Sequence, residues 1–306
     1  MSLGTREKKI IAVSWVAIIG NAILSILKVS VGILSGSMAV IADGIDSASD
    51  VLTSLITLFT AHIIGRPPDL RYPYGYRKAD TMATKILSFI IFFAGSQLFI
   101  SSIGKLIHPE PHGIPAAIAI YIIIISIIGK QGLALYLKKA GKTAESSMLI
   151  ANSKNMQSDV IISISVLVGL IITYVLKMPI LDVITALLVS IWIMFVAIKI
   201  FFESGRDLMD GIDDPEIYKQ VIAACTQIKG VSNPHRIRIR KIANLYLVTL
   251  DIELPEYMTL KEGHLLSQAV EENIKTQIPN IYDVLVHIEP EGNKEAEVFG
   301  VSEKDL

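Results

Sequence analysis

Two aspartates that lie four residues apart in an apolar stretch are the residues of this chain best suited to chemistry. In a helix, Asp46 and Asp50 project from one face, one turn apart. An ionised carboxylate at the centre of a membrane helix costs about 2.5–3.5 kcal/mol. We therefore expect the pair to meet a positively charged partner, and a divalent cation meets that requirement.

A second polar pair has the same spacing in another apolar stretch. Asn155 and Asp159 are again four residues apart, and they lie about as far from the start of their stretch as the first pair does. The two stretches are expected to cross the membrane in opposite directions, so both pairs reach the same depth near its middle. Together they offer three carboxylates and one amide, which is a set of four oxygen ligands.

Ordinary hydrogen bonds between helices are the alternative explanation, and they contribute about 0.6 kcal/mol each in membranes. They would account for Asn155 alone but not for three acids at one depth, because no arginine nearby offsets their repulsion. Three lysines within apolar stretches, Lys28, Lys85 and Lys130, are expected to snorkel or to pair locally. Asp43 fits a structural role and a role on an access route equally well.

Composition indicates a membrane protein. Of the 306 residues, 52% are hydrophobic and 19% are charged, and the mean hydropathy is +0.54. The net charge of −1 indicates neither a nucleic-acid partner nor an anchor to anionic lipid. The single cysteine, Cys225, excludes an internal disulfide framework and a multi-cysteine metal cluster.

Hydropathy predicts six transmembrane helices, each long enough to cross a bilayer: 10–34, 37–64, 79–107, 114–137, 145–176 and 180–202. Basic residues gather at one side of these helices. They are Arg6, Lys8, Lys9, Arg66, Arg71, Arg77, Lys78, Lys138, Lys139 and Lys142, whereas the other side has Lys105 and Lys177. The distribution predicts that both termini are cytoplasmic.

The chain after residue 210 has the pattern of a small soluble α+β domain. A helix begins after Asp214 and Pro215, and a capping box of Thr259 and Glu262 begins a second one. Alternating residues predict strands at 235–240, 246–254 and 284–289, giving the order α-β-β-α-β. The fold class is therefore an all-α membrane bundle of six helices (1–210) with a cytoplasmic α+β domain (211–292). We expect a flexible tail (293–306).

These features together resemble the cation diffusion facilitators, which are proton-linked exporters of divalent metals. The family carries a (His/Asp)-x-x-x-Asp pair in the second span and a (His/Asp/Asn)-x-x-x-Asp pair in the fifth. Both pairs of this chain match those positions. Flanking motifs agree as well: Gly36-Ser37, Ala42-Asp43, Tyr72-Pro-Tyr-Gly-Tyr76 and Gln157-Ser-Asp-Val160.

The resemblance implies a homodimeric transporter in the cell membrane, with a ferredoxin-like cytoplasmic domain. It makes Asp46, Asp50, Asn155 and Asp159 the ligands of the transported ion. It also implies that the cytoplasmic domain binds a regulatory divalent cation through His235, Asp251, His264, His287 and Glu289. No other cofactor is expected, and the partners are metal ions, protons and the lipid bilayer.

The ligand types favour manganese. Zinc-type members place a histidine in at least one pair, but neither pair here contains one, and an oxygen-only site suits harder ions such as Mn²⁺. Iron and zinc follow as candidates. A further loop site seen in some members is expected to be absent, because Tyr72 and Tyr76 stand at its histidine positions beside Asp69. Lys78 and Asp210 match a family ion pair that could interlock two protomers, or form a simple surface pair.

Other classes of function remain open at this point. A zinc-type exporter is the first alternative. A membrane enzyme could use Asp50 and Asp159 as a catalytic pair of acids from different helices, and a metal sensor could use the helices as an anchor. The sequence has no Gly-x-x-x-x-Gly-Lys motif, so ATP is not expected to drive transport.

Overall fold

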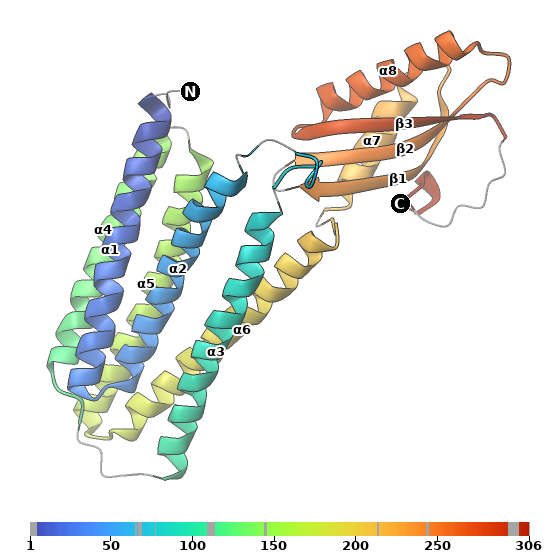
Figure 1. Ribbon diagram of the computed structural model, residues 1–306. Helices are drawn as coiled ribbons and strands as arrows, with labels where there is room; N and C mark the ends of the chain where they lie inside the picture. Colours follow the sequence, from blue (N-terminus) through green and yellow to red (C-terminus); the bar gives the residue numbers. More distant parts are fainter. Residues whose placement is uncertain are drawn as a thin grey trace. The chain divides into compact units, whose positions relative to one another are not determined.

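The structure is a computed structural model that describes residues 5–64, 66, 69–76, 78–108, 114–143, 146–212, 214–242, 245–292 and 300–305. The chain divides into two compact units, Met1–His62 with Ala83–Phe202 and Ile63–Met82 with Glu203–Leu306. The first unit is built from helices, and the second contains a three-stranded sheet (Figure 1). The helical unit and the unit with the sheet are therefore distinct parts of the molecule.

Six long helices lie where the hydropathy predicts them: α1 (Thr5–Ser35), α2 (Met38–Ile64), α3 (Ala79–Ile107), α4 (Ile118–Thr143), α5 (Ser147–Leu176) and α6 (Ile180–Leu208). Among the described residues, every one of these except α2 has a sufficiently apolar window to cross a membrane. α2 has 27 residues, which is long enough, but it carries three aspartates in its first half. The predicted helical membrane bundle is confirmed.

A tight turn positions the start of α2. Gly36 has a φ of +72°, which glycine adopts without strain, and it separates α1 from α2. The Ser37 hydroxyl and the Met38 N–H each donate a hydrogen bond of 2.6 Å to the buried carboxylate of Asp182 on α6. Negative charge is favoured at a helix N-terminus, so Asp182 anchors α2 and fixes the depth of the aspartates that follow.

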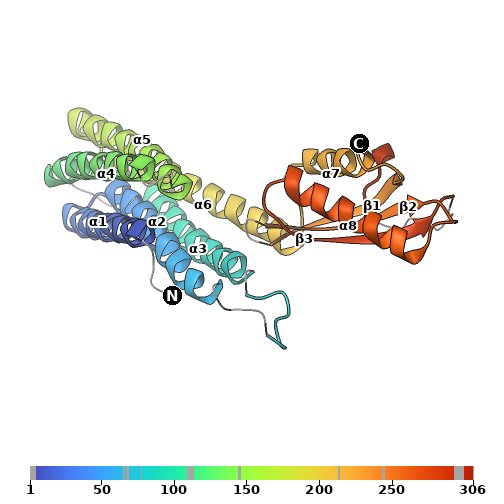
Figure 2. The ribbon, with the colours of Figure 1, turned by 90° about the horizontal axis from the view of Figure 1, so that it is seen from above.

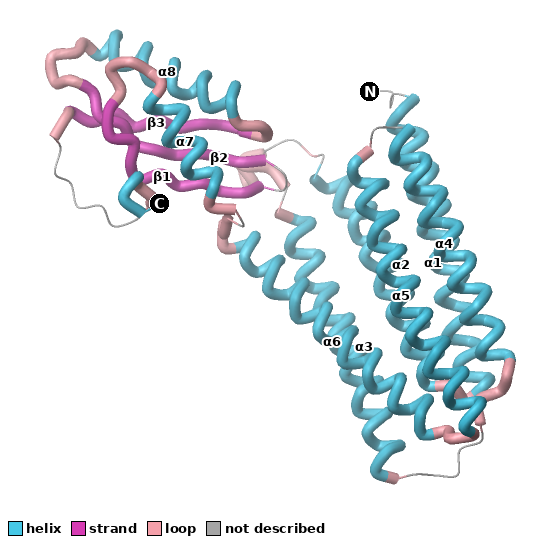
Figure 3. The backbone as a smooth tube through the Cα atoms, turned by 180° about the vertical axis from the view of Figure 1, so that it is seen from behind, coloured by secondary structure: helices cyan, strands magenta, loops and turns pink. Residues whose placement is uncertain are grey.

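Small residues let the helices approach closely. The backbone of α2 passes α1 at Gly44, where an added Cβ would lie 2.6 Å from Val29 Cγ2 and 3.0 Å from the Val29 nitrogen. The Gly44 carbonyl accepts a 2.9 Å hydrogen bond from Ser25 on α1. On the other side of the unit, α3 runs beside α6 (Figure 3). The Phe89 and Phe201 rings of these two helices meet edge to face.

The second unit has the predicted α-β-β-α-β order: α7 (Glu216–Thr226), β1 (Ser232–Ile242), β2 (Leu245–Leu254), α8 (Leu260–Gln277) and β3 (Ile281–Pro290). β2 is the central strand and pairs antiparallel with β1 and parallel with β3. α7 and α8 contact each other and cover one face of the sheet (Figure 2). The predicted capping box is present, with Thr259 and Glu262 bonded in both directions.

The last described residues lie against the sheet. Val301 forms an antiparallel bridge to Ile237 on β1, and a short 3₁₀ turn (Glu303–Asp305) follows. Gly300 has a φ of +105° and touches the backbone of Arg236, where a Cβ would lie 2.5 Å away. Of the predicted flexible tail, residues 293–299 and 306 lie outside the described residues.

Candidate metal centre

A cavity of about 360 Å³ lies within the helical unit, and all four predicted ligands line it. α2 contributes Asp46 and Asp50, whereas α5 contributes Asn155 and Asp159. Spacing of four residues places each pair on one helical face, as expected. The two pairs, which are about 110 residues apart in the sequence, therefore meet at one site.

The four side chains differ in their access to the cavity. The side chain of Asp159 is 12% exposed and that of Asp50 is 25% exposed, whereas Asn155 is exposed in the single chain. Carboxylate and amide oxygens are hard ligands that suit Mn²⁺, and also Ca²⁺ and Mg²⁺. Among the described residues that line the cavity, none is a histidine or a cysteine.

Further polar residues line the same cavity and were not predicted. They add hydroxyl and amide groups from three helices, Asn21 on α1, Ser49 and Thr53 on α2, and Asn152 and Ser158 on α5. Ser49 and Thr53 follow the acids of α2 at helical spacing, and Asn152 precedes Asn155 by three residues. These spacings could have predicted that the additional residues line the same cavity, because residues three and four apart share a helical face.

Lys130 on α4 is the largest departure from the expected site. Its Nζ lies 3.0 Å from Asp50 Oδ2 and 2.9 Å from Asp159 Oδ2, and the residue is 2% exposed. Of the two expectations for Lys130, snorkelling or local pairing, the structure shows pairing, and the partners are two of the predicted ligands. A lysine in the middle of a long apolar helix is too far from either end to snorkel. Its position in the sequence could therefore have predicted that it pairs with an acid inside the helical unit.

Asp43 lies in a separate buried cluster. Its Oδ2 is 2.7 Å from Lys28 Nζ, and its Oδ1 accepts a 2.8 Å hydrogen bond from Ser163. Lys28 also donates to Ser47 and Ser163, each at 3.1 Å, and both charged side chains are almost fully buried. This network joins α1, α2 and α5, which favours the structural role for Asp43 over the access route.

The loop before α3 is held by Asp69. Its carboxylate accepts hydrogen bonds from the Tyr76 hydroxyl at 2.6 Å and from the backbone N–H groups of Tyr72 and Arg71. These bonds, that from Tyr76 foremost, lower the pKa of Asp69. Asp69 therefore has a structural role in this loop, at the position of the further metal site that the sequence predicts to be absent.

Asp210 binds two cations within the same chain. Its Oδ1 lies 2.5 Å from Lys78 Nζ, and its Oδ2 lies 2.9 Å from Arg240 Nε on β1. Lys78 also donates to the Leu208 carbonyl at 3.3 Å. The predicted Lys78–Asp210 pair is therefore present inside one chain, where it joins the segment before α3 to the end of α6.

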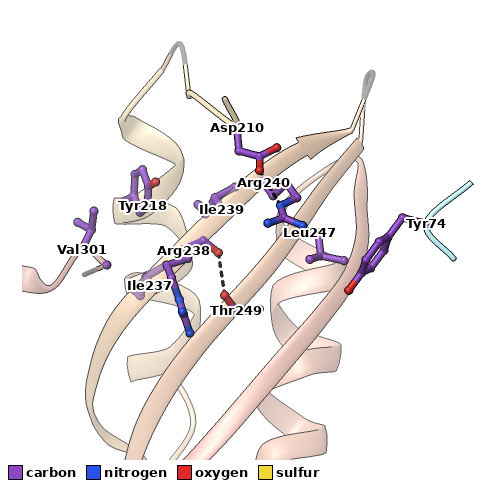
Figure 4. Close-up of a pocket in the computed structure, with 11 residues that line it drawn as sticks. Tyr74, Asp210, Tyr218, Ile237, Arg238, Ile239, Arg240, Leu247, Thr249 and Val301 are labelled. Carbon is purple, nitrogen blue, oxygen red and sulfur yellow. Dashed lines mark hydrogen bonds and ion pairs between the residues drawn. The ribbon is translucent and has the colours of Figure 1, made fainter. Parts of the chain in front are cut away.

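An open pocket of about 530 Å³ lies beside this ion pair at β1 (Figure 4). Arg238 and Arg240 alternate along the strand with the buried Ile237 and Ile239, while Tyr74 approaches from the loop before α3. Within the pocket, Arg240 is paired with Asp210. The Thr249 hydroxyl donates a hydrogen bond to the Arg238 carbonyl, which Figure 4 draws as a dashed line. Its lining contains no predicted ligand.

A second group of ligand-type side chains lies within the sheet. One atom each of His235, Asp251 and Glu289 lies within 4.8 Å of the others, and all three residues are buried. Two irregularities in β1 flank His235, and such bulges re-aim side chains. The His235 Nδ1 contacts the Asn233 carbonyl at 2.7 Å and must donate to it, so Nε2 faces Glu289 at 3.4 Å.

Arg236 shares this second group. Its Nη1 lies 2.9 Å from Asp251 Oδ2 and 3.7 Å from Glu289 Oε1. Arg236 has a φ of +49°, in the left-handed region, which turns its side chain toward the same acids as His235. The cation beside two buried carboxylates was not predicted.

The other two predicted cytoplasmic ligands lie outside this group. His287 pairs with Asp251 in the strand register, but its side chain is 64% exposed and its Nε2 is 3.8 Å from Glu289 Oε1. His264 lies on α8 and is exposed. The structure therefore brings three of the five predicted residues together, with His287 at the margin.

Comparisons with known proteins agree along the whole chain. The model of the cation efflux transmembrane domain matches residues 14–209, and that of the cation efflux protein cytoplasmic domain matches residues 214–291. The chain is 30% identical over 297 residues to the manganese efflux system protein MneP of Bacillus subtilis, covering 93% of this chain and 97% of that protein.

Two further comparisons extend these findings. MneS of Bacillus subtilis, also called a manganese efflux system protein, is 30% identical over 277 residues, covering 90% of this chain and 93% of that protein. The metal-bound C-terminal domain of the CzcD transporter from Thermotoga maritima is 34% identical, with a TM-score of 0.26, over 26% of this chain and 93% of that one. The chain belongs to the cation diffusion facilitators, the family of multi-pass membrane proteins that carry out cation efflux.

Proposed function

We propose that this cation efflux protein exports Mn²⁺ from the cytoplasm in exchange for protons. Asp46, Asp50, Asn155 and Asp159 hold the ion during transport. The observation that carries this proposal is the cavity in the helical unit, where both polar pairs meet and the described lining offers no nitrogen or sulfur ligand of the kind zinc prefers.

Manganese is favoured over zinc by ligand type and by relatives. Divalent zinc binds more tightly than manganese at most sites, so selectivity for Mn²⁺ must come from ligands that zinc favours less and from the ions available. An oxygen-only set meets the first condition. The names of MneP and MneS as manganese efflux proteins support the same ion, with Fe²⁺ and Zn²⁺ as the next candidates.

Proton exchange follows from the chemistry of the ligands. A carboxylate binds a metal ion when it is deprotonated, so metal and protons compete for Asp46, Asp50 and Asp159. Inward movement of protons can then drive outward movement of metal while the helical unit alternates between its two openings. The basic residues of the loops support cytoplasmic termini and a location in the cell membrane.

The second group of ligand-type residues is the regulatory site in this proposal. His235, Asp251 and Glu289 would bind a divalent cation. Without that ion, Arg236 balances part of the negative charge of Asp251 and Glu289. His287 lies near enough to complete the group on the exposed side of the strand, whereas His264 has no part in it. The match of this unit to the cation efflux cytoplasmic domain also supports a homodimer.

Uptake into liposomes tests the proposed function. Purified protein would be reconstituted, and Mn²⁺, Fe²⁺, Zn²⁺ and Mg²⁺ would be offered separately, each with and without an imposed pH gradient. We expect Mn²⁺ to be transported fastest and the gradient to accelerate it. Equal rates with and without the gradient would exclude proton exchange, and faster Zn²⁺ transport would make this a zinc-type exporter.

A further inference from the structure

Lys130 is a buried cation that the proposed set of ligands does not require. Its ammonium lies within 3.0 Å of both Asp50 and Asp159, on the side of these residues that faces α4. The residue itself is 2% exposed, while both acids line the cavity. One positive charge thus stands between two of the three acidic ligands proposed for the transported ion.

Two roles for this lysine make opposite predictions. If Lys130 only fastens α4 to its neighbours, its loss should loosen the acids and weaken metal binding. If its ammonium takes the place of a cation, its loss should free two carboxylates and tighten metal binding. Removing one partner of a buried ion pair leaves the other charge uncompensated, which a metal ion can then satisfy.

The packing of α4 favours the second role, because other contacts already hold this helix. Ser153 on α5 donates a 2.8 Å hydrogen bond to the Ala134 carbonyl. Gly129 lets Leu24 of α1 approach, since an added Cβ would lie 3.2 Å from Leu24 Cδ2. The charge of Lys130 is therefore not needed to place α4, and its long flexible stem allows the ammonium to withdraw.

The other buried lysine shows how a purely structural pair differs. Lys28 binds Asp43, Ser47 and Ser163, so three partners satisfy its three N–H groups. Asp43 does not belong to the lining of the cavity that Asp46 and Asp50 share. Lys130 instead binds the two acids that the transported ion would need.

We propose that Lys130 is a tethered cation that occupies the transport site in the absence of metal and that the metal ion displaces from Asp50 and Asp159. This inference rests on the proposed transport site. The ammonium balances part of the acidic charge while the carrier is empty, which lowers the cost of burying the carboxylates. It also weakens metal binding and speeds release, since the lysine recaptures its acids as the ion leaves.

Direct measurement of Mn²⁺ binding tests this role without relying on transport. The purified full-length protein would be titrated with Mn²⁺ by calorimetry, and bound Mn²⁺ would be released by excess chelator in a stopped-flow instrument. Lys130→Gln should bind Mn²⁺ about tenfold more tightly or more, equivalent to ~1.4 kcal/mol, and should release it correspondingly slowly. Lys130→Arg should bind several-fold more weakly, because a guanidinium holds carboxylates in two parallel hydrogen bonds.

Two further variants separate this inference from the function on which it rests. Lys85→Gln removes a lysine of α3 that lies over the Phe201 ring, outside the cavity lining, and should bind Mn²⁺ as the wild type does. Asp159→Ala should lose Mn²⁺ binding, and if it does not, the proposed site itself is wrong. If Asp159→Ala loses binding while Lys130→Gln binds equally or more weakly, only the role of Lys130 is overturned. Should Lys130→Gln not fold, wild-type or tighter binding by Lys130→Arg would overturn it equally.

Discussion

Asn155 is the proposed ligand without a charge, and it is also the most exposed of the four. Its amide oxygen is a weak ligand for zinc and cannot be titrated at neutral pH. Each acidic ligand offers both a charge and a place for a proton, whereas Asn155 offers neither. Selectivity among divalent ions should therefore depend on this residue more than on the acids.

Replacing Asn155 with histidine should shift the chain toward zinc. An imidazole nitrogen at this position suits a tetrahedral site with three carboxylates, and a gain of ~1.4 kcal/mol for zinc over manganese corresponds to tenfold. We expect Asn155→His to raise the ratio of Zn²⁺ to Mn²⁺ uptake by about that factor in the same vesicles. Asn155→Gln, which keeps the amide, is the matched control. An unchanged ratio in an active histidine variant would show that residue 155 does not touch the ion.

Cys225 should be inert toward thiol reagents in the folded protein. It is the single cysteine of the chain, it is fully buried between α7 and the sheet, and burial raises its pKa to about 12. The reactive thiolate is therefore scarce at neutral pH. Maleimide labelling followed by intact-mass measurement should show no modification at pH 7.5 until the protein is denatured. Rapid labelling of the folded protein would contradict the packing of this unit.

The sequence predicted that four polar residues would share one site, because helical spacing puts Asp46 with Asp50 and Asn155 with Asp159, and all four line one cavity. It could not identify the partner of these acids, because Lys130 lies on a different helix and only packing decides which helices are neighbours. The same limit applied to the cytoplasmic residues. Strand alternation placed Glu289 and His287 on one face, but the bulges of β1 decide that His235 points to Glu289.

Among the helices, the contact between α1 and α2 controls where the acids of α2 lie. Gly44 lies on α2 between Asp43 and Asp46, and because it has no Cβ, α2 can pack closely against Val29 of α1. Ser25 and Lys28 of α1 then reach α2 from the same side. Spacing and motif in the sequence predicted α2 itself, but a glycine in a helix gives no sign of which neighbour it contacts.

Gly44→Ala should therefore destabilise the protein. The added methyl group would lie 3.0 Å from the backbone nitrogen of Val29, so a helix must shift, and such overpacking costs about 1–3 kcal/mol. Gly132→Ala on α4 is the matched control, because no atom of another described segment lies within 4 Å of its added Cβ and alanine favours the helix. We expect a lower melting temperature for Gly44→Ala and an equal or higher one for Gly132→Ala. Equal melting of both variants would exclude a close contact at Gly44.

Two separate groups of acids lie in the two units of the molecule, one in each. The site in the helices is reached through a cavity, and the group in the sheet is buried around His235. Under the proposed function, this division would separate transport from regulation. Loss of a regulatory ligand should then alter the metal concentration at which transport begins and leave maximal transport intact. The exposed His264 belongs to neither group.

Variants of the cytoplasmic group test this division. His235→Ala should shift the Mn²⁺ concentration for half-maximal uptake upward, because it removes the nitrogen ligand from a buried pair of acids. His264→Ala should behave as the wild type does. Uptake by both variants would be measured over a range of Mn²⁺ concentrations in liposomes. Complete loss of uptake in His235→Ala at saturating Mn²⁺ would place the cytoplasmic group on the transport path.

Mn²⁺ uptake by single variants of the cavity's acids measures whether these acids carry the ion. Asp50→Ala and Asp159→Ala each remove one of three carboxylates, and Lys85→Gln controls for the loss of a charged side chain elsewhere in the membrane helices. The variants would be reconstituted at equal amounts after gel filtration confirms folding. Both aspartate variants should reduce Mn²⁺ uptake to the level of empty liposomes, while Lys85→Gln should retain wild-type uptake. Wild-type uptake by either aspartate variant would show that the substituted carboxylate does not carry the ion.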